Sequence, residues 1–346
     1  MQNIEALHAY SINNARAEKL AKCFLGKVPA YDVTGRGVLF LTERCNFNCL
    51  YCKRAQYTQR DFGVDEAKKV VSRLADFKCK YLHLTGGEVT IFDGLDEIVG
   101  VAKERGMTSS LSTNGTGSPE LYKKLVENGA KFFYVTLNTD NQSECDQMTG
   151  RKNTFEQIVE TVGGLVGMRD AGKDVYLTIN VVVCDNNISR VEDIANFVSG
   201  LRPDDFKLIP TTRLMHSMTD EQKAKIAHLA EKSGALREKY NFFNYRLGHF
   251  ATMRGLKDKK YAGTRCYICM DERVYGPEHY WPCDIYFREK GKPLGRRSES
   301  LAAQADQAFE FAIRRNPSED PICREFCCDI TRDFNLAVHE MVEKGG

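Results

Sequence analysis

The stretch Thr42-Glu43-Arg44-Cys45-Asn46-Phe47-Asn48-Cys49-Leu50-Tyr51-Cys52 follows directly after an apolar run at residues 37–41. Its cysteines have the spacing C-x3-C-x2-C, and a short loop after a strand can bring such thiolates together at one soft metal centre. A four-iron cluster needs a ligand on each iron, and this loop supplies three of the four. Zinc is the alternative, but structural zinc sites close with four ligands, and no histidine or fourth cysteine lies within reach of this loop. Cys45, Cys49 and Cys52 therefore predict a [4Fe–4S] cluster with one iron open to a ligand from outside the protein.

The bulk composition is that of a globular protein without a strong charge preference. The 346 residues are enough for one domain of roughly 200–250 residues and a smaller module. The net charge is +2, so neither nucleic acid nor an anionic membrane is indicated as a partner. No apolar run reaches the length of about 20 residues that spans a bilayer, and residues 1–22 lack a signal-peptide core. The 13 cysteines then indicate metal ligation or free thiols in a reducing compartment, and we expect a cytoplasmic protein.

Beyond the cysteine loop, strands and helices alternate along the chain. We expect strands at residues 37–41, 81–85, 108–112, 132–137, 175–183 and 206–209. The periodicity predicts helices at residues 4–25, 64–77, 95–105, 119–128, 154–169 and 191–201, and a long charged helix at 219–239. This alternation favours a parallel α/β arrangement, because right-handed crossovers set each helix between neighbouring strands.

The cysteine loop, with Tyr51 immediately before its last cysteine, resembles the cluster motif of radical S-adenosylmethionine (radical SAM) enzymes. The resemblance implies a partial (β/α)6 TIM-like barrel over residues 37–215, with cofactor and substrate at the carboxyl ends of the strands. It also implies that S-adenosylmethionine binds the open iron, and that its reductive cleavage yields a 5′-deoxyadenosyl radical that abstracts hydrogen from a substrate. A flavodoxin- or ferredoxin-type protein would supply the electron. Residues 1–36 are then a helical lead-in, and residues 216–264 a connection out of the barrel.

Several expected strand ends carry groups that match this family. Gly86, Gly87 and Glu88 resemble the motif that holds the methionine amino group, although such a segment can also be a simple turn. The segment from Ser112 to Gly115 resembles the ribose-contacting strand end, and an Asn-Gly turn is its plain alternative. The further candidate cofactor contacts are Asn114, Asn138, Arg151 and Asn180.

A second group of cysteines lies in residues 265–346. Cys266, Cys269 and Cys283 have the spacing C-x2-C-x13-C, with an expected β-hairpin at residues 274–282 that returns Cys283 toward the first pair. Zinc-ribbon sequences share this pattern. Next to a radical SAM core it resembles the SPASM and twitch extensions, which implies an auxiliary [4Fe–4S] cluster with a fourth ligand from Cys323, Cys327 or Cys328. We expect the remaining Cys23, Cys79, Cys145 and Cys184 to be packed in the core, and Cys184 is also a weak candidate for a catalytic hydrogen donor.

The resemblance leaves several functions open. An oxidation of a small molecule assisted by the auxiliary cluster is the first of these. A peptide-modifying maturase is the second, but residues 1–36 leave no room for a leader-binding domain. The C-x2-C-x13-C spacing also resembles the molybdenum-cofactor GTP cyclase family, which keeps three auxiliary ligands, whereas this chain has further cysteines to close the cluster. A non-catalytic iron–sulfur or zinc protein would need only the cysteines, so Gly86, Gly87 and Glu88 argue against it.

Overall fold

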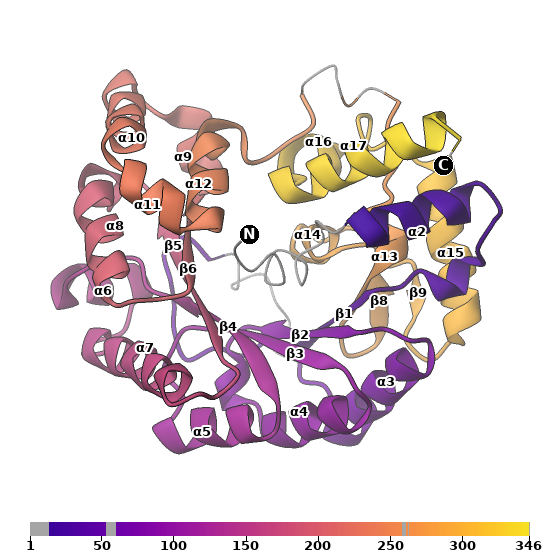
Figure 1. Ribbon diagram of the computed structural model, residues 1–346, viewed down its shortest axis with the longest axis horizontal. Coiled ribbons are helices and arrows are strands. Elements are labelled where there is room, and N and C mark those ends of the chain that lie inside the picture. The colour runs from indigo at the N-terminus through magenta and orange to yellow at the C-terminus, as the bar shows by residue number, and fades with distance from the viewer. Residues whose placement is uncertain (1–13, 53–59, 258–260, 262, 346) are drawn as a thin grey trace.

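The computed structural model describes residues 14–52, 60–257, 261 and 263–345. They form a single mixed sheet in the order β6-β5-β4-β3-β2-β1-β7-β8-β9, curved into an open ring with helices on its outer side (Figure 1). Strands β1 to β6 are all parallel, and each pairs with its successor in the sequence. The expected partial barrel is therefore confirmed.

The barrel elements lie close to the ranges expected from the sequence. The strands are β1 (Arg36–Thr42), β2 (Tyr81–Gly86), β3 (Thr108–Thr113), β4 (Ala130–Thr136), β5 (Tyr176–Val183) and β6 (Asp205–Pro210). The helices between them are α3 (Val64–Asp76), α4 (Leu95–Glu104), α5 (Pro119–Glu127), α6 (Gln142–Thr149), α7 (Phe155–Asp170) and α8 (Val191–Gly200), with short 3-10 turns η3 (Val89–Ile91) and η4 (Ile188–Arg190). The sequence analysis did not predict α6.

Helix α3 shows why the crossover helices cover the outer face of the sheet. Its buried residues Ala67, Val70, Val71 and Leu74 recur at three- and four-residue intervals, so they form one apolar stripe. The stripe packs so closely on β1 that a Cβ added to Gly37 would lie 2.4 Å from Cδ1 of Leu74. A glycine at this position therefore lets α3 approach the strand.

The chain after the barrel consists mainly of helices. They are α9 (Thr212–Ser217), α10 (Asp220–Lys232), α11 (Gly234–Lys239), α12 (Asn241–Gly248), η5 (Phe250–Thr252), α13 (Ile268–Asp271), α14 (Asp284–Arg288), α15 (Leu301–Arg314), α16 (Pro321–Phe326) and α17 (Asp329–Glu343). The prediction of one helix over 219–239 is wrong, because Ser233 ends α10 and α11 begins after it.

The cysteine-rich segment continues the barrel sheet. Strand β7 (Glu272–Tyr275) pairs in parallel with β1, and β8 (His279–Trp281) and β9 (Gly295–Arg296) follow antiparallel. The expected hairpin is confirmed, with Val274 opposite Trp281 and Tyr275 opposite Tyr280. The second group of cysteines is thereby attached to the strand that leads into the first.

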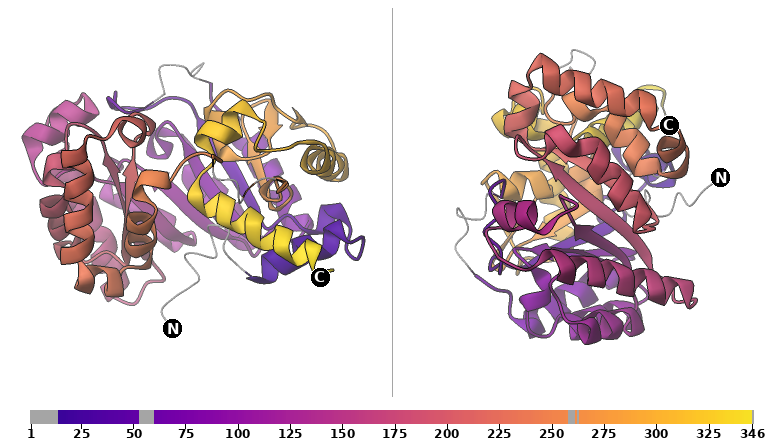
Figure 2. Two further views of the ribbon diagram at one scale, coloured as in Figure 1. Left: turned by 90° about the horizontal axis from the view of Figure 1, so that it is seen from above. Right: turned by 90° about the vertical axis from the view of Figure 1, so that its left-hand side faces the viewer.

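The two ends of the described chain lie side by side. Helix α2 (Asn14–Phe24) packs against α17, as the left view of Figure 2 shows. Arg16 of α2 forms an ion pair with Asp271, whose side chain is fully buried, and the backbone N–H of Gly35 donates to the Asp271 carbonyl at 2.9 Å. This contact fixes the entry into β1 against the start of β7. In the part of the chain that the structure describes, no helix has the length and apolar character to cross a bilayer.

Removal of the Asp271 carboxylate tests this connection. We expect Asp271→Ala to lower the free energy of unfolding by about 3–5 kcal/mol, because it removes the buried carboxylate that pairs with the guanidinium of Arg16. Asp76→Ala is the matched control, since it breaks a pair with Arg105 in which both side chains are exposed, by 58% and 42%. The control should cost less than about 1 kcal/mol in urea unfolding. Equal losses in the two variants would contradict this account.

Candidate functional site

A cavity of about 370 Å³ lies inside the curved sheet, and residues at the carboxyl ends of the parallel strands line it. The loop after β1 contributes Cys45, Cys49, Tyr51 and Cys52 to its lining. The next strands contribute the other candidates at or near their ends, namely Gly86, Gly87, Glu88, Ser112, Asn114, Asn138 and Asn180. The sequence-predicted residues of the first site thus face one common space, apart from Arg151 and Cys184.

The cysteine loop is held against the end of β2 by the main chain. The N–H of Gly87 donates to the Thr42 carbonyl at 2.7 Å, and the N–H of Glu88 donates to the Arg44 carbonyl at 2.9 Å. A Cβ on Gly86 would lie 2.2 Å from the Thr42 oxygen, and one on Gly87 would lie 1.9 Å from the Arg44 oxygen. In the sequence, these glycines resemble part of a motif that holds the methionine amino group. In the structure they first allow the close approach of the cysteine loop itself.

The Glu88 carboxylate joins β2 to β3. Its Oε1 accepts hydrogen bonds from the Thr90 N–H at 2.9 Å and the Thr113 hydroxyl at 2.7 Å, and its Oε2 accepts from the Asn114 N–H at 2.6 Å. Burial raises the pKa of this carboxyl, and the hydrogen bonds oppose the rise. The contact with a methionine ammonium stays a prediction, and it would use the acceptor capacity that remains on Oε2.

Two asparagines brace the same loop from neighbouring strand ends. The Asn114 amide donates to Oδ1 of Asn46 at 2.7 Å, and the Asn138 amide donates to the Tyr51 hydroxyl at 2.7 Å. Tyr51 also interacts with Cys49 and Cys52, and its hydroxyl has a pKa well above the usual range because it is buried. Positions proposed as cofactor contacts therefore also position the cysteine-bearing segment.

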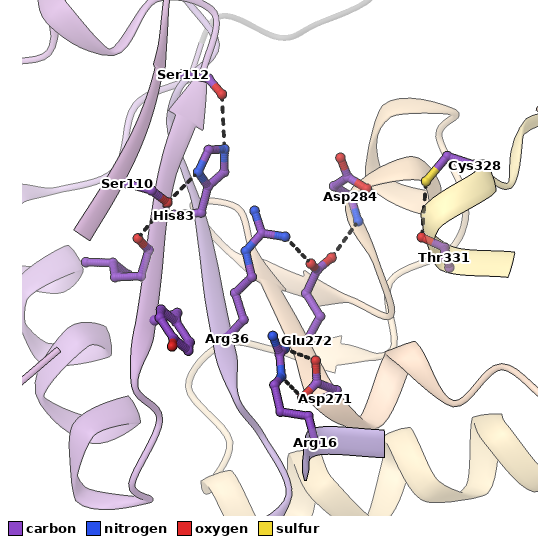
Figure 3. Close-up of polar contacts among 12 residues, drawn as sticks. Arg16, Arg36, His83, Ser110, Ser112, Asp271, Glu272, Asp284, Cys328 and Thr331 are labelled. Carbon is purple, nitrogen blue, oxygen red and sulfur yellow. Dashed lines mark hydrogen bonds and ion pairs between the residues drawn. The ribbon is translucent and has the colours of Figure 1, made fainter. Parts of the chain in front are cut away.

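His83 of β2 is a cavity residue that the sequence analysis missed. Its Nδ1 lies 2.8 Å from the Ser110 hydroxyl and its Nε2 lies 3.1 Å from the Ser112 hydroxyl (Figure 3). Because the Ser110 hydroxyl donates to the Leu82 carbonyl, it accepts from Nδ1, and Nε2 accepts from Ser112. Burial and nearby Arg36 hold the pKa of His83 well below its ordinary value, so the ring is neutral. A lone histidine in a strand gave no sequence signal for this role.

Arg151 and Cys184 lie outside the cavity lining. The Arg151 guanidinium is exposed and donates to the Asn46 carbonyl at 3.2 Å, so it supports the cysteine loop. The Cys184 thiol lies 3.8 Å from Oδ1 of Asn186 in the turn after β5. The structure therefore gives no support to Cys184 as a hydrogen donor or to Arg151 as a direct cofactor contact.

The second group of cysteines comes from α13 and the residues before it, the start of α14, and α16 and its end. Cys266 interacts electrostatically with Cys283, Cys323 and Cys327, and hydrogen-bonds with Cys269. Burial is the largest cause that holds the thiol pKa values of Cys283, Cys323 and Cys327 above their ordinary range. Such buried thiols become thiolates readily only beside a metal or another positive charge. Thus sulfur atoms from distant parts of the sequence share one buried region.

Cys328 interacts electrostatically with Cys327 of this group, but its side chain has a different setting. Its Sγ lies 3.1 Å from the Thr331 hydroxyl at the start of α17, and it lines the main cavity (Figure 3). The neighbouring Cys327 instead packs with Leu256, Tyr261 and Cys323. Adjacent cysteines thus face different spaces, which spacing along the sequence could not reveal.

The cysteine groups offer the donor types that an iron–sulfur cluster requires. Within the described ranges, no three cysteine, histidine, aspartate or glutamate side chains are grouped closely enough to hold a single metal ion. The three motif cysteines nevertheless line one cavity, and thiolates are the usual ligands of a [4Fe–4S] cluster. The residues present therefore fit such a cluster in ligand type and number, and its assignment stays a prediction.

Comparison with known proteins gives the family of the barrel. Residues 39–198 match the family model described as "Radical SAM superfamily". A Fe-coproporphyrin III synthase of Methanosarcina barkeri is 30% identical over 159 residues, which cover 44% of this chain and 37% of that protein. A probable GTP 3′,8-cyclase of Sulfolobus acidocaldarius is 30% identical over 187 residues, covering 51% of this chain and 58% of that protein. The matched part of the chain thus spans less than two thirds of the length of either relative.

A solved structure shows the same fold over a larger part of the chain. The crystal structure of Streptococcus suis SuiB bound to the precursor peptide SuiA has a TM-score of 0.63 to this chain. The match covers 92% of this chain and 74% of that one, at 15% sequence identity. A likeness at this identity concerns the fold alone.

The contact between the glycines and the cysteine loop can be tested by adding one methyl group. We expect Gly87→Ala to lower the free energy of unfolding by at least about 1–3 kcal/mol and to reduce bound iron, because the new Cβ displaces the Arg44 carbonyl. Gly163→Ala in α7 is the control, since no atom lies within 4 Å of the added Cβ. The control should gain about 0.5–1 kcal/mol of helix stability. A Gly87→Ala protein with unchanged stability and iron content would refute the proposed contact.

Proposed function

Residues 39–198 are a radical SAM domain, and from this premise we propose that the chain reductively cleaves S-adenosylmethionine and abstracts hydrogen from a substrate C–H bond. The main observation that supports this proposal is that Cys45, Cys49 and Cys52 line one cavity with Glu88 and the polar strand ends. Neither a zinc protein nor an electron carrier needs that second set of residues. An enzyme with a nucleoside cofactor does need them, because it must orient the cofactor against its substrate.

The residues of the chain have distinct tasks in this proposal. Cys45, Cys49 and Cys52 would hold a [4Fe–4S] cluster, which together with S-adenosylmethionine supplies a 5′-deoxyadenosyl radical when both are bound. Glu88 would accept a hydrogen bond from the methionine ammonium through Oε2 while it keeps β2 joined to β3. Asn138 holds the Tyr51 hydroxyl and thereby the loop, and Asn180 lines the adjoining wall of the cavity.

The second group of cysteines would hold an auxiliary [4Fe–4S] cluster. Support comes from the grouping of Cys266, Cys269 and Cys283 with Cys323 and Cys327, and from the attachment of their segment to β1 through β7. A cluster with four thiolate ligands has no open iron for substrate. We therefore assign this cluster to electron transfer, which favours an oxidation as the overall reaction.

A small molecule is the favoured substrate. The cavity volume of about 370 Å³ lies in the range of small-molecule sites, and buried charged side chains form part of its lining. A peptide substrate is the second candidate, because the chain has the fold of SuiB, which has been solved with its precursor peptide. The similarity to a probable GTP 3′,8-cyclase keeps a nucleotide rearrangement as a third candidate. A flavodoxin- or ferredoxin-type protein is the proposed reductant in each case.

Replacement of the three motif cysteines tests the cleavage reaction. The variant Cys45→Ala, Cys49→Ala, Cys52→Ala should produce no 5′-deoxyadenosine from S-adenosylmethionine under dithionite, because no thiolate remains to hold the first cluster. It should keep the iron bound by the second group of cysteines. Product formation is followed by chromatography, with iron counted in the same preparation. Cleavage by the triple variant at the wild-type rate would show that the proposed function is wrong.

The orientation of the tail cysteines gives a second test. The double variant Cys323→Ala, Cys327→Ala should lose the fourth thiolate of the auxiliary cluster, whichever of the two supplies it. Cys328→Ala is the matched control and should retain a cluster with four thiolates, because Cys328 faces the main cavity. Mössbauer spectra and iron analysis distinguish the two outcomes. An opened cluster in Cys328→Ala, or zinc at the site, would overturn this assignment.

A further inference from the structure

Basic side chains gather in the part of the cavity that the cysteine loop does not line. We call Arg36, Lys207, Arg246, Arg254 and Arg288 the basic cluster, and all five line the cavity. They come from β1, β6, α12, the segment after η5, and α14. Lys207 lies in register with Asn180 of β5 and interacts electrostatically with Arg246 and Arg36. The sheet and the C-terminal helices therefore bring these charges to one region from separate parts of the sequence.

Part of this positive charge is balanced inside the protein. Nη1 of Arg36 lies 2.7 Å from Oε2 of Glu272, and the guanidinium of Arg246 pairs with the buried Asp329. Nε of Arg288 lies 3.8 Å from Oδ2 of Asp284, and its guanidinium stands over the ring of Phe40. Each of these three pairs has a net charge close to zero. The carboxylates would hold the arginine side chains in position around a ligand in the cavity.

Two further members of the cluster have contacts of another kind. Nζ of Lys207 lies 4.8 Å from the ring centroid of Tyr134 and 5.0 Å from that of Phe242. Nη1 of Arg254 donates to the Phe326 carbonyl at 3.4 Å. Glu88, Glu272 and Asp284 are the only acidic side chains in the described lining. The five basic side chains outnumber these three, while Asp329 and Asp205 interact with Arg246 and Lys207 from outside the lining.

The buried guanidinium of Arg246 also retains an unused donor. Its residue is 6% exposed and lines the cavity, and in the part of the chain that the structure describes its Nε has no hydrogen-bond partner. A buried donor without a partner destabilises the native state. The residue lines the cavity, and a guanidinium is suited to carboxylate and phosphate oxygens in particular.

The lowered pKa of Lys207 also favours an anionic ligand in the cavity. Burial is the main cause that lowers the pKa of its ammonium to about 7, and Arg246 lowers it further. A buried positive charge of this kind disfavours the native state, and a lysine kept in such a place is frequently a functional one. A bound anion would offset both the burial and the neighbouring positive charges.

We propose that the basic cluster binds an oxyanion group of the substrate, either a carboxylate or a phosphate. The inference rests on the proposed function, since it takes the cavity to be the substrate site. Arg246 and Lys207 would contact the oxyanion, and Arg254 would approach it from the C-terminal segment. The reacting carbon would then lie on the side toward the cysteine loop. Substrates without an anionic group would bind weakly.

The test measures binding of simple anions to the full-length protein, anaerobically reconstituted with iron. Calorimetric titration with inorganic phosphate is one arm, and titration with succinate is the other, so that the two kinds of oxyanion are distinguished. We expect saturable binding of at least one of them near one equivalent. Lys207→Met should weaken that binding by at least about tenfold, because it removes a charge-assisted contact.

Lys207→Met is suited to this purpose because it replaces a buried charge by an apolar side chain of similar size. Such a change is often neutral or stabilising, so the variant should unfold at the same or a higher temperature than the wild type. Arg254→Gln is the second variant and removes the partly exposed member of the cluster. Arg314→Gln is the control, since its side chain is 75% exposed on α15, and it should bind the anion like the wild type.

The pH dependence provides an independent readout. Affinity should fall as the pH rises from about 6 to about 8, since Lys207 loses its proton over this range, and Lys207→Met should not show this fall. The charged and titratable groups that face Lys207 come from its own strand and five other elements, namely Asp205, Arg36, His83, Tyr134, Arg246 and Asp329. His83 is neutral across this range because its pKa is already far lower.

The result that overturns the proposal is wild-type protein that binds neither anion, or variants at Lys207 and Arg254 that bind as tightly as Arg314→Gln. Formation of 5′-deoxyadenosine by the wild type is measured separately. Anion binding without S-adenosylmethionine cleavage would count against the proposed function and leave the oxyanion site standing. Cleavage of S-adenosylmethionine without anion binding would count against the oxyanion site and leave the proposed function standing.

Discussion

The close main-chain contact between residues 42–44 and residues 86–88 is the constraint on which the site depends. Two hydrogen bonds join these segments, and neither glycine at the contact leaves space for a Cβ. The contact fixes where the cysteine loop leaves β1, and Glu88 extends it to β3 through Thr113 and Asn114. A short segment therefore relates the cluster-binding loop to the strand ends that border the cavity. The position of the cluster-binding loop therefore depends more on the geometry of the sheet than on the sequence of the loop.

The cavity then divides into two chemically different parts. Toward the cysteine loop, the lining consists of thiols, amides and hydroxyls that hydrogen-bond with one another. Toward the C-terminal helices, it consists of buried ion pairs and the basic cluster. Buried charges are costly to maintain, so their concentration on one side indicates a selected role. His83 of β2 hydrogen-bonds with two serines and interacts electrostatically with Arg36, Arg288 and Lys207 of the basic cluster.

Much of the barrel could be predicted from the sequence, because periodicity and alternation are local properties. The strands at 81–85 and 108–112 and the helix at 64–77 agree closely with β2, β3 and α3. The motif residues could be predicted as neighbours, since parallel strands bring their carboxyl ends to one edge. The pairing of β7 with β1 could not, because it joins positions more than 200 residues apart. The same holds for the Arg16–Asp271 pair, whose partners lie far apart along the chain.

The functional surroundings were harder to predict for a related reason. In the sequence Lys207 is a single charge within an apolar strand, and only its neighbours Arg246 of α12 and Arg36 of β1 show that it belongs to a group of cations. Cys327 and Cys328 are adjacent, yet the turn before α17 directs them to different spaces. Spacing along the sequence gives only the number of residues between two side chains. Metal ligation and ligand recognition depend on the direction in which each side chain points.

The most direct measurement of the central claim is electron paramagnetic resonance of the reduced, reconstituted protein with and without S-adenosylmethionine. The account predicts that adding the cofactor changes the g values of one cluster signal, because an open iron at Cys45, Cys49 and Cys52 gains new ligands. It also predicts that any signal from the second group of cysteines stays unchanged. Iron-loaded protein whose entire spectrum is insensitive to S-adenosylmethionine would contradict the account.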